Sequence, residues 1–111
     1  MKKKPIKLNA LQSRTLALFQ LLAQSEENAT FDKNSGEISI RYLPQPHGDH
    51  VHVGDYVISA KDASGFSNET VWRALERKGL ARSNFPLEII LTPEGQAHDT
   101  GLSENFQKSD H

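Results

Sequence analysis

Hydrophobic residues near the N-terminus recur with the spacing of a helix. Leu11, Leu18 and Leu22 are separated by seven and then four positions, so they fall on one face of an α-helix. The pattern predicts a helix over residues 9–25. The stretch that follows, residues 26–36, is polar and contains Asn, Asp, Ser and Gly, a composition that indicates a loop.

Alternating residues then indicate two strands. Residues 38–42 alternate between large hydrophobic and polar side chains, and residues 50–53 alternate between histidine and valine. A period of two is typical of a half-buried strand. We expect the two strands to pair as a hairpin. Residues 55–60 have the spacing of a short helix, although Tyr, Val and Ile also favour strands.

The last third of the chain predicts a helix, a β-hairpin and a second, short helix. The first helix covers residues 67–78, the strands lie at residues 80–82 and 87–91, and the short helix ends near His98. Three hydrophobic residues form the inner face of the longer helix: Val71, Ala74 and Leu75.

Residues typical of helix caps mark the expected ends of the helices. Asn9 with Gln12 three positions later is typical of a capping box. Ser67 and Thr92 are candidate N-caps, since a hydroxyl oxygen can accept from the first free N–H groups of a helix. Gly79 is expected to end the longer helix in the left-handed conformation.

This order of elements predicts an α+β fold. Within it, residues 64–97 resemble regulators related to the multiple-antibiotic-resistance repressors. The resemblance is carried by Leu75-Glu-Arg-Lys-Gly-Leu80 and by Leu91-Thr-Pro-Glu-Gly95. It implies a winged helix-turn-helix with a three-helix core and a β-hairpin wing. It also implies that the helix at residues 67–78 reads duplex DNA. The additional strand pair expected between the first and second helices is an insertion relative to those regulators.

The chain departs from those regulators in its wing and its ends. The wing is cut to Ser83-Asn-Phe-Pro86, and the long helices that dimerise those regulators are not evident. The chain is therefore either a monomer or a homodimer of another kind. We expect a basic arm over residues 1–8, the domain over residues 9–99, and a polar, disordered tail over residues 100–111.

Charge and composition narrow the function class. The 111 residues suffice for one domain, and the net charge is −1. Residues 1–14 carry five cations and no acid, while residues 71–91 carry four cations and two acids. This distribution is compatible with an anion-binding face. There is no cysteine and no long apolar stretch, so we expect a cytoplasmic protein without disulfides or a thiolate metal site.

The candidate DNA contacts follow from the predicted helix and its surroundings. Arginine can read guanine and asparagine can read adenine, while Ser, Thr and Lys can contact phosphate. The candidates are Ser67, Asn68, Thr70, Arg73, Arg77, Lys78 and Arg82, together with Lys2, Lys3 and Lys4 of the arm. The outward face is expected to show Asn68, Glu69, Trp72, Arg73 and Glu76.

Two of these assignments have structural alternatives. Trp72 is also explained as a half-buried residue that packs on the first helix or on the hairpin. Glu69 and Arg73 also form an (i, i+4) pair that would simply support the helix.

A histidine cluster offers separate chemistry. Imidazole and carboxylate are ligands for Zn or Ni, and four such groups lie within six positions: His47, Asp49, His50 and His52. The alternative is a hairpin end with solvated histidines.

The sequence thus predicts a small prokaryotic transcriptional regulator without catalytic activity. Two alternatives stay open. One is a winged-helix module that binds protein rather than DNA, and the other is a metal-responsive sensor that uses the histidine cluster.

Overall fold

The computed structural model describes residues 6–102 and 107–108, which fold as an α+β structure. The described helices are α1 (Ala10–Leu22), the 3-10 helix η1 (Ser64–Ser67), α2 (Glu69–Arg77) and α3 (Pro93–Ala97). The described strands are β1 (Ala29–Asp32), β2 (Glu37–Arg41), β3 (His50–Val53), β4 (Tyr56–Ser59), β5 (Ala81–Asn84), β6 (Glu88–Leu91) and β7 (Gln107–Lys108).

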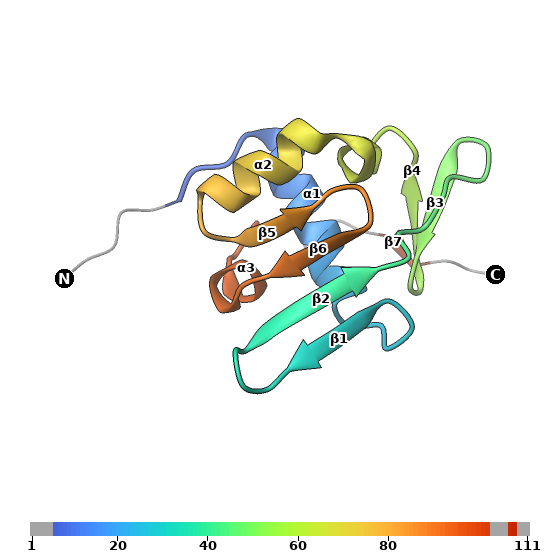
Figure 1. The fold of residues 1–111 in the computed structure, drawn as a ribbon. Helices are drawn as coiled ribbons and strands as arrows, with labels where there is room; N and C mark the ends of the chain where they lie inside the picture. The colour runs from blue at the N-terminus through green and yellow to red at the C-terminus, as the bar shows by residue number, and fades with distance from the viewer. Residues whose placement is uncertain (1–5, 103–106, 109–111) are drawn as a thin grey trace.

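The larger sheet has the strand order β1-β2-β6-β5, and every neighbouring pair is antiparallel. In the register of β2 and β6, Ile40 lies opposite Ile89 and Ile38 lies opposite Leu91. Ile40, Ile89 and Leu91 have no exposed surface. Helix α1 passes behind this sheet and α2 runs along its β5 edge (Figure 1). Burial of these side chains between helix and sheet is the main favourable term for the fold.

The predicted hairpin between residues 38–42 and 50–53 is wrong. Strand β2 pairs with β1 and β6, whereas β3 pairs with β4 in a second sheet of order β3-β4-β7. Strand β1 lies in the stretch that the sequence indicated as loop. Strands β2 and β6 are far apart in the sequence. Their pairing is decided by which hydrophobic surfaces can be buried together, and not by the local residue pattern.

The short helix expected over residues 55–60 is also wrong, because these residues contain β4. Only Gly54 and Asp55 separate β3 from β4, and Gly54 has a φ of 60°. A two-residue connection with a positive φ at glycine is a hairpin turn. The pairing places Val51 opposite Ile58, and both side chains are buried.

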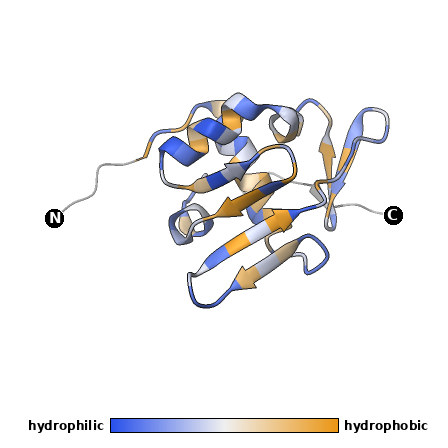
Figure 2. Cartoon of the chain, viewed as in Figure 1, coloured by the Kyte–Doolittle hydropathy of each residue, from blue (hydrophilic) through white to orange (hydrophobic). Residues whose placement is uncertain are grey.

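The N-cap of α2 lies one residue later than predicted, because Asn68 rather than Ser67 caps the helix. The Asn68 side chain accepts hydrogen bonds from Thr70 N and Val71 N. Ser67 is instead the last residue of η1. The bands of hydrophobic and hydrophilic residues along α2 in Figure 2 reflect its amphipathic character.

Trp72 packs into the centre of the core, and its assignment to the outward face of α2 is wrong. Its side chain is 0% exposed, so it is also more buried than the half-buried alternative. Its ring meets Phe19 of α1 edge-on at 5.5 Å and Phe85 of the hairpin at 4.9 Å. Its indole Nε1 donates to Gly65 O at 3.1 Å. The residue therefore joins α1, η1, α2 and the hairpin.

Several predicted local devices are confirmed. Asn9 and Gln12 form the capping box of α1, and Thr92 caps α3. Gly79 has a φ of 76°, which favours glycine. Gly95 sits against the backbone, since an added Cβ would lie 1.8 Å from Leu80 O. This close approach explains why the segment needs a glycine there.

The described residues leave out parts of both ends of the chain. Residues 1–5, which include Lys2, Lys3 and Lys4, lie outside the described residues. Two residues of the expected tail, Gln107 and Lys108, pair with β4 as strand β7. Across residues 6–102 and 107–108, no helix is long and apolar enough to cross a membrane.

Candidate nucleic-acid interface

The outer face of α2 is polar and mixed in charge. Five of its residues are exposed: Glu69, Thr70, Arg73, Glu76 and Arg77. They recur at intervals of three and four positions, which places them along one side of the helix. The opposite side is buried through Val71, Trp72, Ala74 and Leu75. Core packing therefore fixes which side chains α2 presents outward.

The two acids of this face are engaged within the structure. Glu69 pairs with Arg73, with Oε2 to Nη2 at 2.9 Å. Glu76 Oε1 accepts a hydrogen bond from Ser83 N at 2.6 Å, so this carboxylate ties α2 to the start of the hairpin. The (i, i+4) pair expected of Glu69 and Arg73 is confirmed. It leaves Arg73 70% exposed.

Uncompensated positive charge gathers at the C-terminal end of α2. The Arg77 side chain forms neither a hydrogen bond nor an ion pair with any described residue. Lys78 Nζ donates to the backbone O of Lys7 at 2.6 Å, so two lysines meet at this end. No described acid forms an ion pair with Lys7, Arg77 or Lys78. These three cations are available to an anionic partner.

The remaining predicted contacts are placed less favourably for nucleic acid. Ser67 Oγ donates to Ser64 O at 3.3 Å, and the Asn68 side-chain oxygen is used as the helix cap. Thr70 is exposed beside them. Arg82 projects from β5 and pairs with Glu37 of β2 through two hydrogen bonds of 2.6 and 3.1 Å. Hydrogen bonding and charge attraction from Glu37 raise the pKa of Arg82.

A hollow of about 600 Å³ lies between α2 and the hairpin. Its lining consists of Glu69, Arg73, Glu76 and Arg77 from α2, and of Ser83, Asn84 and Phe85 from the hairpin. The structure therefore brings two arginines and two glutamates of α2 and residues of the β5–β6 hairpin to one concave surface. Lys78 and Lys7 meet beyond the last turn of α2.

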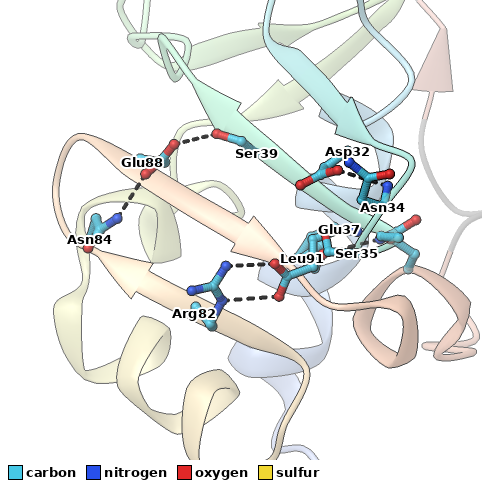
Figure 3. Close-up of polar contacts among 11 residues, drawn as sticks. Asp32, Asn34, Ser35, Glu37, Ser39, Arg82, Asn84, Glu88 and Leu91 are labelled. Atoms are coloured by element: carbon cyan, nitrogen blue, oxygen red, sulfur yellow. Dashed lines mark hydrogen bonds and ion pairs between the residues drawn. The ribbon is translucent and has the colours of Figure 1, made fainter.

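A group of hydrogen-bond donors around the Glu88 carboxylate was not predicted from the sequence. Glu88 accepts hydrogen bonds from Ser39 of β2 and from Asn84 (Figure 3). It also accepts one from Arg41. These donors, Ser39 foremost, lower the pKa of Glu88 to about 2. The partners from β2 lie more than forty positions away in the chain, so no local motif marks them. The register of β2 against β6 brings Arg41 opposite Glu88.

The histidine cluster gathers as expected, but without the geometry of a metal centre. The ring centroids of His47, His50 and His52 lie 4.9–6.1 Å apart. Asp49 Oδ1 lies 3.3 Å from His50 Nδ1. Even so, within residues 6–102 and 107–108 no three His, Asp or Glu side chains are placed to hold a metal ion. The metal site stays a prediction.

Comparison with known proteins gives this surface no counterpart: no family model, curated protein or solved structure matches the chain.

Proposed function

We propose that the chain is a winged-helix protein that binds duplex nucleic acid through the outer face of α2. The observation that carries the proposal is the free positive charge of Lys7, Arg77 and Lys78 beside the hollow between α2 and the hairpin. Phosphate contacts of this kind supply most of the affinity of non-specific DNA binding.

The topology supports this proposal. A winged helix places one strand of the early chain beside the last strand of the wing. Here β2 lies beside β6, and β6 lies beside β5. Helix α2 precedes the β5–β6 hairpin directly, as a recognition helix precedes its wing. In this assignment η1 takes the place of the helix before the recognition helix, and the β3–β4 hairpin is inserted ahead of it.

The roles of the side chains follow from their positions. Arg73 and Thr70 stand on the N-terminal half of α2, the part that enters the major groove in helix-turn-helix proteins. Arg73 can donate two hydrogen bonds to guanine once it leaves Glu69, and Glu69 can accept from cytosine N4. Lys7, Arg77 and Lys78 contact the phosphate backbone, which orients the helix without reading sequence.

A matched pair of charge variants tests this assignment. Arg77→Ala removes a free cation from α2, and we expect it to weaken binding to a labelled mixed-sequence duplex by about tenfold. Lys33→Ala removes one cation from the exposed turn between β1 and β2, at the sheet edge opposite β5. This control should bind as the wild type does. Equal losses in both variants, or none in Arg77→Ala, would refute the proposed face.

A further inference from the structure

A second concave surface lies beside the turn of the β5–β6 hairpin. It is a groove of about 1040 Å³ between the chain that leaves β2, the turn joining β5 to β6, and η1. These three segments lie side by side in Figure 1. Ligand sites for small molecules have volumes of ~300–1,000 Å³ and are lined mostly by hydrophobic and aromatic side chains. The size of the groove is at the upper end of this range.

The floor of the groove is made of core residues. Val51, Ala63 and Phe66 line it, and each is buried, with Phe66 only 8% exposed. Phe85 forms a wall, and its ring is held edge-on against Trp72 at 4.9 Å. The floor is therefore rigid, because it belongs to the packed centre of the molecule.

The rim carries exposed hydrophobic side chains that the fold does not use for packing. Tyr42 and Leu87 are each 78% exposed and line the groove. Tyr42 also has a φ of 59°, a conformation that no other non-glycine residue adopts in the described part of the chain. A bulky residue pays about 1–2 kcal/mol for this conformation. Strain at an exposed aromatic residue beside a cavity is typical of a binding site.

The groove presents no net charge. Its charged side chains are Arg41 and Glu88, which pair with each other at 3.0 Å between Nε and Oε2. Glu88 is bound further by Ser39 and Asn84. A charged ligand would have to give up its hydration without gaining a free counter-charge, which is costly. The lining still offers single hydrogen-bonding groups, such as the hydroxyls of Ser64 and Ser67.

We propose that this groove binds a neutral, largely apolar small molecule that contains aromatic rings. Its rings would lie against Phe66 and Phe85 and be covered by Tyr42 and Leu87. The groove shares Asn84 and Phe85 with the hollow beside α2, but the proposal does not require the chain to bind DNA.

A pair of ring compounds that differ by one charge tests the proposal. N-phenyl-1-naphthylamine is neutral, whereas 8-anilinonaphthalene-1-sulfonate adds an anionic group to the same ring frame. Both fluoresce more strongly in apolar sites. Trp72 is the one tryptophan of the chain, so quenching of its emission reports a ligand seated near Phe85. We expect saturable one-to-one binding of the neutral compound, at least about tenfold tighter than the anion.

Rim variants locate the binding. Tyr42→Gly removes the ring and also relieves the positive φ, and Leu87→Ser removes a side chain that is already exposed. Both should fold, as near-ultraviolet circular dichroism would confirm. We expect the double variant to weaken binding by about tenfold or more. Phe31→Ser is the control, because Phe31 is 60% exposed on β1 and does not line the groove.

Three outcomes would overturn the proposal. The first is the absence of saturable binding to the folded wild type. The second is an equal loss of affinity in Phe31→Ser, which would show general adhesion to exposed hydrophobic residues. The third is equal affinity for the neutral and anionic compounds, which would contradict the neutral character of the groove.

Discussion

At the scale of single residues, Glu88 shows how a carboxylate can be fixed by groups that the sequence does not associate with it. Its position in a strand could be predicted from residues 87–91, which read as hydrophobic and β-forming. Its partners Ser39 and Arg41 come from β2, and the pairing of β2 with β6 was not predicted. The cluster could be recognised only after the register was known.

The first prediction concerns the pH dependence of this cluster. The folded pKa of Glu88, about 2, is below its ordinary value of 4.5, so folding favours the ionised form. Its contribution to stability is full above about pH 4.5 and is lost as the pH falls towards about 2. Glu88→Gln should therefore lower the free energy of unfolding by about 1–3 kcal/mol near neutral pH, and by progressively less in acid.

Urea denaturation at about pH 7, 5 and 3 measures this difference. Glu27→Gln serves as the control, because Glu27 is exposed and bonds no other described residue through its side chain. A constant difference between Glu88→Gln and the wild type across this range would contradict the lowered pKa.

The second prediction concerns Gly95. An added Cβ would lie 1.8 Å from the backbone O of Leu80, and a backbone atom cannot move aside as a flexible side chain can. Gly95→Ala should cost about 3 kcal/mol or more in stability. In Gly101→Ala nothing lies within 4 Å of the new Cβ, and only the φ of 73° is unfavourable. This control should cost about 1–2 kcal/mol. Equal thermal stability of the two variants would refute the close approach.

At the scale of elements, α2 combines a correct prediction with a shifted boundary. The hydrophobic spacing gave Val71, Ala74 and Leu75 as the buried face, and all three are buried. The cap was misplaced by one residue, because both Ser67 and Asn68 are good N-cap residues. Only the 3-10 turn of η1, which ends at Ser67, decides between them.

The third prediction therefore compares the two caps. Asn68→Ala leaves the N–H groups of Thr70 and Val71 without their acceptor and should cost about 1 kcal/mol of stability. Ser67→Ala removes only a bond of 3.3 Å to Ser64 O at an exposed site and should change stability by less than about 0.5 kcal/mol. The reverse order of the two variants in urea denaturation would return the cap to Ser67.

Strands β4 and β1 show how far the local residue pattern could predict strands. The residues of β4 fit both a helix and a strand, yet the Gly54-Asp55 pair before them was a usable hairpin signal. Strand β1 offered no such signal. It is an edge strand of four residues, three of them exposed, and its pairing with β2 depends on the rest of the sheet.

At the scale of the whole molecule, the α+β class and the order of α2, β5, β6 and α3 followed from the sequence. Local residues mark the helix boundaries around the β5–β6 hairpin. Asn68 and Thr92 cap the N-termini of α2 and α3, and Gly79 follows the C-terminus of α2. The assembly of two sheets did not follow, because it depends on contacts between distant segments. The same is true of the groove beside Tyr42, whose lining comes from several distant parts of the chain.

The candidate interface was predicted in part at this scale. Arg73, Arg77 and Thr70 are exposed on α2 as expected. The engagement of Arg82 with Glu37, and the meeting of Lys78 with Lys7, could not be read from spacing. These contacts place the free positive charge at the C-terminal end of α2.

The salt dependence of binding to a mixed-sequence duplex tests the central proposal most directly. If Lys7, Arg77 and Lys78 each displace a counterion, log K should fall with log salt concentration with a slope of about −3 or steeper. Absence of binding at low salt, or binding that is insensitive to salt, would contradict a nucleic-acid interface on α2.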